Sequence, residues 1–290
     1  MLETLKSFVN TWECDENNHL NVQFYFERFE DADRHFHLIA GLDPALAGER
    51  ISRHVRYHRE SHVADLQVVR SGLYDQAAGS LTILHVLYDL GSGAIFATAL
   101  DLYRPPRPLP EVLLNGLPEA PEAERRAARP RSFAEALPAL SVSAEALMRS
   151  GGFISYYGVV KPAHCTAEGA LDDRSLIACI SNAAAHVWET APMTRDWLDR
   201  HTYGRVAVEM RLAYGAPVPV GTLTRVISKW SAVQRTSFAF RHHVMDARTG
   251  ACHAIVEATG LVMDLNTRKA VPLPEDFRAS LLKLADLPER

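Results

Sequence analysis

The sequence predicts an α+β protein built from two similar units, each an antiparallel sheet wrapped around one long helix. Three observations predict this fold class. A strand, a polar turn, a helix and four further strands occur twice in the same order. The two copies share short matches at nearly constant offsets, which indicates an internal repeat. A segment rich in Pro, Ala and Glu separates them.

In the first copy, spacings of four, three and four place Tyr25, Phe29, Ala32 and Phe36 on one face of a helix. Asn21 is a candidate cap for the start of this helix, and Gly41 for its end. Turn residues then separate four strand-like runs, at 51–59, 66–71, 81–88 and 94–103.

The second copy repeats this plan with a strand at 153–161, a helix at 175–189 and strands at 206–214, 222–230, 236–245 and 251–264. Tyr88–Ala94 (YDLGSGA) aligns with Met245–Ala251 (MDARTGA) at an offset of 157, and Cys14 aligns with Cys165 at 151. A single unit would expose a sheet edge, so we expect the two copies to pack as a pseudo-dimer.

The predicted division is a first domain at 1–105, a Pro/Ala-rich linker at 106–148, a second domain at 149–275 and a C-terminal tail at 276–290. Proline removes backbone donors and resists both helix and central strand, which favours a linker between the copies.

Composition and charge narrow the classes of function. The formal net charge is −4 and no Lys/Arg-rich run has the character of a nucleic-acid-binding surface, so no nucleic-acid partner is expected. The four cysteines form no CxxC pair, so zinc-ribbon and thioredoxin-like sites have little support. No signal peptide and no apolar run of about 20 residues is evident, so we expect a cytoplasmic protein without a membrane partner.

The stretch Thr11–Phe36 carries the most informative motif, in which Asp15, His19, Asn21 and Tyr25 stand at fixed spacings. The motif resembles the signature Asp-x-x-Gly-His-x-Asn-x-x-x-Tyr of the 4-hydroxybenzoyl-CoA thioesterase family of hot-dog proteins, which includes many acyl-CoA thioesterases. The residues FEDA that begin at Phe29 resemble the acidic and aromatic helix that follows in that family.

The resemblance implies two tandem hot-dog domains and hydrolysis of an acyl-CoA thioester to a free acid and a thiol. It implies that Asp15 is the nucleophile or general base and that His19 and Asn21 belong to the catalytic site. Asn18 and Tyr25 are the candidates for substrate binding, although Asn18 could instead narrow the pocket and Tyr25 could instead be a core residue. This chemistry is physically reasonable, because a carboxylate just before a helix lies close to N–H groups that can polarise the thioester oxygen. No metal and no organic cofactor is implied.

The sequence departs from the family in both copies. Asn18 stands at the glycine position, and Asn tolerates positive φ better than other side chains, so we expect the turn to survive. In the second copy Thr166 stands where Asp15 stands, and Ala170 replaces His19. Glu168 and Asp172 are candidates for a second or composite site, although Asp172 could instead cap the helix.

Alternatives stay open for individual residues. Asp15 could only stabilise the turn, and His19 could be a structural histidine. The basic residues around Arg53, His54 and Arg56 could contact CoA phosphates or lie on a solvated sheet face.

Alternatives also stay open for the whole protein: an acyl-ACP thioesterase, a hot-dog dehydratase, or a non-catalytic acyl-thioester binding protein. The acyl group cannot be read from the sequence, and pairing of two chains into a homo-oligomer is left open.

Overall fold

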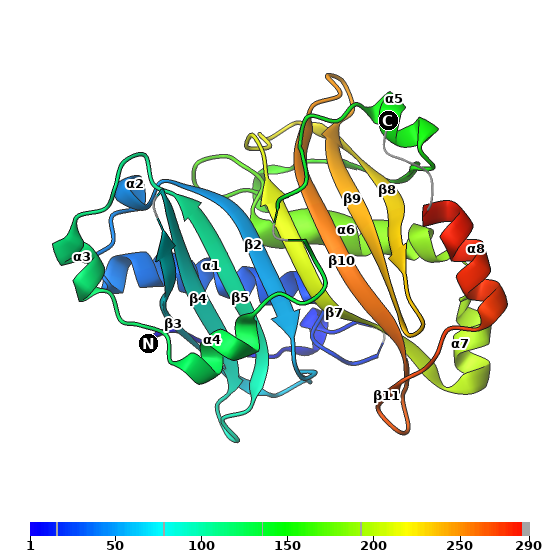
Figure 1. The fold of residues 1–290 in the computed structure, drawn as a ribbon, viewed down its shortest axis with the longest axis horizontal. Coiled ribbons are helices and arrows are strands. Elements are labelled where there is room, and N and C mark those ends of the chain that lie inside the picture. Colours follow the sequence, from blue (N-terminus) through cyan, green and yellow to red (C-terminus); the bar gives the residue numbers. More distant parts are fainter. Residues whose placement is uncertain (16, 78, 135, 192, 286–290) are drawn as a thin grey trace. The chain divides into compact units, whose positions relative to one another are not determined.

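The computed structural model describes residues 1–15, 17–77, 79–134, 136–191 and 193–285. They form two compact units, unit 1 at Met1–Phe133 and unit 2 at Ala134–Arg290. Figure 1 shows in each unit one long helix lying against a sheet. Of the predicted linker and tail, residues 135 and 286–290 lie outside the described residues.

Unit 1 contains a five-stranded antiparallel sheet in the order β1-β3-β4-β5-β2. The long helix α1 packs on β1, β3 and β4. Its elements are β1 (Leu2–Phe8), the 3-10 helix η1 (Thr11–Glu13), α1 (Val22–Ile39), α2 (Pro44–Ala47), β2 (Glu49–Tyr57), β3 (Leu66–Ala77), β4 (Ser80–Asp89), β5 (Ile95–Arg104), α3 (Glu111–Gly116) and α4 (Glu122–Ala128).

Unit 2 repeats the sheet in the equivalent order, β6-β8-β9-β10-β7, with the short β11 paired to β10. The long helix α6 packs on β6 and β8. Its elements are α5 (Ala144–Arg149), β6 (Phe153–Val159), η2 (Pro162–His164), α6 (Asp173–Trp188), α7 (Arg195–His201), β7 (Tyr203–Tyr214), β8 (Leu223–Val233), β9 (Ser237–Asp246), β10 (Cys252–Asp264), β11 (Lys269–Ala270) and α8 (Glu275–Ala285). The predicted α+β class, with a sheet around a long helix in each repeat, is confirmed.

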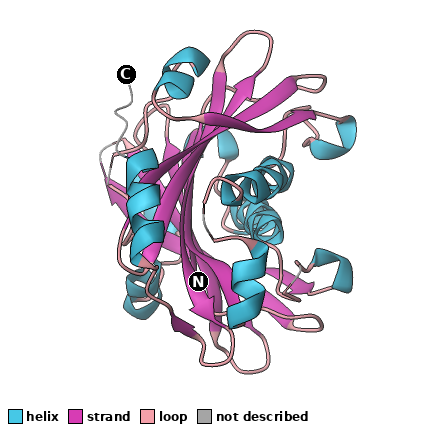
Figure 2. Ribbon diagram, turned by 90° about the vertical axis from the view of Figure 1, so that its right-hand side faces the viewer, coloured by secondary structure: helices cyan, strands magenta, loops and turns pink. Residues whose placement is uncertain are grey.

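The long helices bury the apolar faces that the spacing predicts, and Figure 2 shows strands curving around helices. Tyr25, Phe29, Ala32 and Phe36 of α1 are at most 3% exposed. At an offset of 151, α6 buries Leu176, Ile180, Ala183 and Val187. Asn21 caps α1, as predicted, and Gly41 has φ +66° just after the helix ends.

The residues that follow β5 cover part of unit 1 rather than lying fully in solvent. Leu117, Ala120 and Ala128 are buried. The guanidinium of Arg56 donates hydrogen bonds to the backbone oxygens of Ala127 and Arg129. This part of the predicted linker is therefore tied to the sheet of unit 1.

The expectation of a solvated face on β2 is wrong for Arg53, His54 and Arg56, which are all buried. Arg53 is fully buried because Asp101 of β5, opposite it in the sheet, accepts from its Nε at 2.7 Å. Burial alone would raise the pKa of Asp101, but the charge and hydrogen bonds of Arg53 lower it well below its usual range. A charge that looks exposed from alternation alone is thus compensated inside the protein.

Both units contain a buried row of hydrogen-bonded side chains, two hydroxyl groups followed by a histidine. In unit 1, Thr4 Oγ1 and Ser71 Oγ are 2.7 Å apart, and Ser71 Oγ lies 2.7 Å from His85 Nδ1. In unit 2, Ser155 Oγ and Ser228 Oγ are 2.6 Å apart, and Ser228 Oγ lies 2.6 Å from His242 Nδ1. The residues of the two rows correspond at the repeat offsets of 151 and 157.

The two histidines differ in the charges around them. His85 Nε2 lies 3.3 Å from Asp101 and 3.5 Å from Asp33, and these carboxylates raise the pKa of His85 despite the opposing effect of burial. Ala258 and Ala184 stand at the two equivalent positions of unit 2. There burial, with a smaller effect of His243, lowers the pKa of His242 to about 3.

This difference predicts acid sensitivity in unit 2. The folded-state pKa of His242 lies below its unfolded value of about 6.5, so its stabilising effect is complete above pH 6.5 and is lost as the pH falls toward 3. We expect the unfolding free energy of unit 2 to fall by about 1 kcal/mol between pH 6.5 and 5.5 because of this group, and His242→Gln to remove that fall.

Urea unfolding followed by tryptophan fluorescence measures this effect, since three of the four tryptophans, Trp188, Trp197 and Trp230, belong to unit 2. His186→Gln, at an exposed site of α6, is the control and should keep the wild-type pH dependence. Equal pH slopes for wild type and His242→Gln would contradict the prediction.

Candidate active site

The turn from Asp15 to Asn21 joins η1 to α1 in unit 1. The backbone N–H of Asp15 donates to the oxygen of His19 at 2.8 Å, and that of Asn18 donates to the oxygen of Asp15 at 3.0 Å. Asn18 has φ +58°, so the prediction that asparagine replaces glycine in a left-handed conformation is confirmed. The motif residues are therefore gathered in one compact loop.

The carboxylate of Asp15 is held by one oxygen. Oδ1 accepts from the backbone N–H of Asn17 at 2.9 Å and from that of His19 at 3.1 Å. Among the described residues no hydrogen bond to Oδ2 is found, and the Asp15 side chain is partly accessible. One oxygen thus orients the group while the other can face a reactant.

The amino-terminal end of α1, which is the positive end of the helix dipole, directly follows the turn that contains Asp15. The side chain of Asn21 accepts from the N–H of Gln23 at 3.2 Å, which fixes the start of the 18-residue helix α1. Tyr25, one turn further on, is only 3% exposed and packs edge-on against Tyr57 at 5.1 Å between ring centroids. Asn21 therefore lies in the turn, while Tyr25 lies in the core beneath it.

A buried ion pair fixes the turn against the helix. Arg28 of α1 donates from one terminal nitrogen to both carboxylate oxygens of Glu13 in η1, each at 3.0 Å, and both residues are buried. The Nε of Arg28 donates to Gln67 Oε1 at 2.6 Å, and Gln67 Nε2 donates to Ser61 Oγ at 2.9 Å. The backbone oxygen of Ser61 in turn accepts from Leu20 at 2.8 Å.

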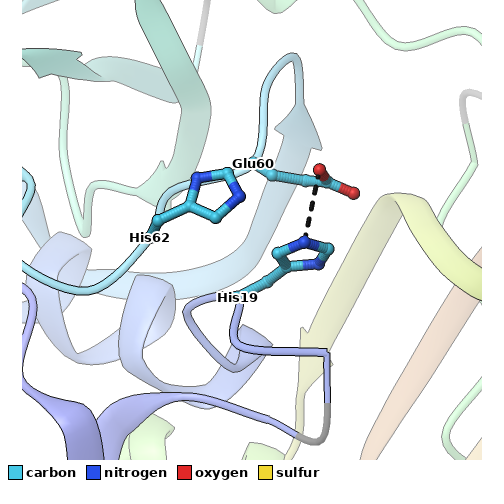
Figure 3. A group of neighbouring side chains, drawn as sticks. All are labelled: His19, Glu60 and His62. Atoms are coloured by element: carbon cyan, nitrogen blue, oxygen red, sulfur yellow. Dashed lines mark ion pairs between the residues drawn. The ribbon is translucent and has the colours of Figure 1, made fainter. Parts of the chain in front are cut away.

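His19 lies beside two further polar side chains, shown in Figure 3. Its Nε2 is 3.4 Å from Oε2 of Glu60, and its ring is 5.0 Å from that of His62 in an edge-on arrangement. Glu60 and His62 come from the segment after β2, so this cluster joins residues more than 40 positions apart.

Unit 2 contains the same turn with different side chains. The N–H of Thr166 donates to Ala170 O at 2.8 Å, and that of Gly169 donates to Thr166 O at 3.0 Å, which repeats the bonds of Asp15 and Asn18. Gly169 has φ +81°, so the glycine of the family motif is present in the copy that lacks the acid and the histidine.

The polar support beneath the turn is also missing from unit 2. His164, Cys179, Thr224 and Val218 stand at the positions of Glu13, Arg28, Gln67 and Ser61. Of the two second-site candidates, Asp172 caps α6 by accepting from the N–H of Ser175 at 2.6 Å, and Glu168 is exposed. The capping alternative for Asp172 is confirmed, and a catalytic role for either stays a prediction.

No pattern in the sequence marked Glu13, Arg28, Gln67 and Glu60 as parts of the site. A buried arginine inside an aromatic helix was the available signal, because arginine is seldom fully buried without a partner. The sequence does not reveal which acid pairs with it.

Among the described residues, none of the helices has both the length and the apolar character needed to span a membrane.

Two repeats that each wrap a sheet around a long helix, with a polar turn before the helix, define a tandem hot-dog protein. A model of the thioesterase-like superfamily matches residues 9–104 and 160–281, well over half of the chain. The chain belongs to this superfamily, which supports thioester hydrolysis as its class of reaction.

Solved structures show the same fold. An acyl-ACP thioesterase from Bacteroides thetaiotaomicron VPI-5482 is 10% identical, with a TM-score of 0.56 over 89% of this chain and 96% of that one. The 12:0-ACP thioesterase from Umbellularia californica is 11% identical, with a TM-score of 0.57 over 88% of this chain and 92% of that one. No curated protein matches the chain.

The buried pair predicts a structural role for Arg28. We expect Arg28→Met to lower the unfolding free energy of unit 1 by about 3 kcal/mol, because Glu13 would be left charged and buried. Urea unfolding followed by far-ultraviolet circular dichroism measures this loss.

Arg34→Met is the matched control on the same helix, where the exposed pair with Glu30 at 3.3 Å should contribute less than about 0.5 kcal/mol. The double variant Glu13→Gln with Arg28→Met should recover part of the loss, since it removes the stranded charge. Equal destabilisation by the Arg28 and Arg34 variants would show that the ion pair does not hold the turn.

Proposed function

We propose that the protein hydrolyses acyl-CoA thioesters at the Asp15–Asn21 turn of unit 1. The coarser assignment, thioester hydrolysis, comes from the superfamily. The finer assignment rests on the chemistry of the residues in the turn.

The observation that carries the proposal is the comparison of the two turns. Thr166 occupies the position of Asp15, yet the turn of unit 2 has the same backbone hydrogen bonds. A carboxylate is therefore not required to form this turn. Its presence in unit 1, on a partly accessible residue, supports a chemical role for Asp15.

Two routes fit a carboxylate in this place. As a general base, Asp15 takes a proton from a water whose oxygen attacks the thioester carbon; the C–S bond then breaks and the thiolate leaves with the proton. As a nucleophile, Asp15 attacks the same carbon, the thiolate leaves, and water hydrolyses the mixed anhydride that results. Both routes yield a free acid and a thiol.

The negative charge that develops on the thioester oxygen needs donors near Asp15. The amino-terminal end of α1 carries the positive end of the helix dipole a few residues from the carboxylate. His19 adds an imidazole in the same turn, and we assign it the orientation of the carbonyl. Asn21 supports this arrangement as the cap of the helix.

The same proposal assigns substrate contacts to Asn18, which is exposed at the tip of the turn. Tyr25, which the signature also nominates, would act from beneath the turn by fixing its position. Glu168 and Asp172 of unit 2 are kept as candidates for a second site.

Acyl-ACP thioesters are the second candidate substrate class. Both solved structures described above are named as acyl-ACP thioesterases. The chemistry at the carbonyl would be identical, and only the carrier of the thiol would differ.

The test is thiol release from a panel of acyl-CoA and acyl-ACP thioesters. Asp15→Asn keeps an oxygen that can accept from Asn17 and His19, so the turn should persist while the negative charge is removed. We expect the rate constant for hydrolysis to fall by roughly 10²-fold or more.

Asp75→Asn is the matched control, since it makes the same change at an exposed position of β3 in unit 1. It should keep wild-type activity within about twofold. Full activity of Asp15→Asn would make Asp15 a structural residue and turn attention to unit 2. Absence of hydrolysis of every thioester by the wild type would favour a dehydratase or a binding protein.

A further inference from the structure

His19, Glu60 and His62 form a convergent cluster at the edge of the candidate active site. One ligand atom from each residue lies within 4.8 Å of the other two. Figure 3 shows the three side chains turned toward a common space. Two imidazoles and one carboxylate are a donor set that zinc and its neighbours in the first transition row favour, whereas magnesium and calcium favour oxygen donors alone.

The backbone holds the three residues in place. His19 and His62 face each other in an antiparallel bridge, and Leu20 N–H donates to Ser61 O at 2.8 Å between them. Asp65 Oδ2 accepts from His62 N–H at 2.8 Å and from Ser61 Oγ at 3.1 Å. Because both segments are fixed, a bound ion would have to order only the side chains.

Unit 2 shows that this local fold does not depend on the three side chains. Ala170 forms the same bridge with Pro219, and Leu171 N–H donates to Val218 O at 2.8 Å. Alanine and two prolines, Ala170, Pro217 and Pro219, occupy the positions of His19, Glu60 and His62. All three potential ligands are thus absent together from the copy that also lacks an aspartate at the position of Asp15.

We propose that His19, Glu60 and His62 bind one divalent cation of the zinc class. Tetrahedral coordination at zinc–ligand distances of about 2.0–2.1 Å places the donor atoms about 3.4 Å apart. The pair formed by His19 and Glu60 is already at 3.4 Å, and the ligand atom of His62 is within 4.8 Å of theirs, so His62 is the residue that has to approach. The exposed His62 leaves the cluster accessible to an entering ion, and a water molecule completes the fourth position.

Metal binding has a consequence for the reaction, and this part rests on the proposed function. The ion takes the Nε2 lone pair of His19, the residue to which we assign the orientation of the thioester carbonyl. Zinc therefore inhibits hydrolysis, and the inhibition disappears in His62→Ala.

The site is tested on the full chain after removal of metal with a chelator and exchange into chelator-free buffer. Zinc binding is measured by calorimetry, and cobalt binding by visible absorption. We expect one ion per chain. We expect His62→Ala and Glu60→Gln each to weaken binding at least tenfold, while His35→Ala, at an exposed histidine of α1, leaves it unchanged.

Circular dichroism of each variant verifies that it folds. Unchanged zinc affinity in His62→Ala and Glu60→Gln would overturn the proposal. A strong thiolate-to-cobalt absorption band would also overturn it, because it would place the ion on a cysteine such as Cys14.

The activity measurement separates the two proposals. Zinc that binds but fails to inhibit an active wild type would remove the competition for His19 and leave the site intact. If the wild type hydrolyses no thioester, the proposed function fails, while the binding titration still decides the metal site.

Discussion

The buried ion pair between Arg28 and Glu13 is the interaction on which the candidate active site depends. Arg28 belongs to α1, Glu13 to η1 and Gln67 to β3, so three elements meet at one guanidinium. Five donors in a planar fork make arginine suited to this task, and lysine could not reproduce it. Removal of one partner would leave a buried charge, which is far more costly than the loss of an exposed pair. The turn of Asp15 is therefore positioned by a group that never needs to touch substrate.

The repeat provides an internal comparison for every part of this arrangement. Both turns have the same backbone bonds and a residue in the left-handed conformation, Asn18 in one and Gly169 in the other. At the aligned positions, only unit 1 has the acid, the histidine and the arginine, which Thr166, Ala170 and Cys179 replace in unit 2. The same division appears deeper in the sheets, where His85 lies beside two carboxylates, while alanines stand at the two equivalent positions of unit 2. Shared backbone with divergent polar groups indicates that this fold accommodates either set of side chains.

Local patterns in the sequence were sufficient for much of the fold. The spacing of Tyr25, Phe29 and Ala32 gave the buried face of α1, and the polar Asn21 gave its start, because both effects act within a few residues along the chain. The conformation of Asn18 followed from the same local physics. Arg53 shows where this reasoning fails. The sequence left a contact with CoA phosphates and a solvated sheet face as its alternatives, but its partner Asp101 is 48 residues away and fully buried with it. The contact of Glu60 and His62 with His19 was not predicted for the same reason, since only the folded chain brings the three residues together.

The two roles open to Asp15 can be separated by physical argument. If its carboxylate served only the turn, the turn of unit 2 would need a comparable acceptor, yet the same bonds form around Thr166. Gly169 offers part of an explanation, because glycine adopts positive φ without strain whereas Asn18 does so at some cost. That cost is about 1 kcal/mol, and the two hydrogen bonds that Oδ1 accepts from backbone N–H groups would offset it. The oxygen of a neutral amide could also accept these two hydrogen bonds, more weakly than a carboxylate does. The backbone of the turn therefore does not by itself require a negative charge at this position, which is in keeping with the role proposed for Asp15 in hydrolysis.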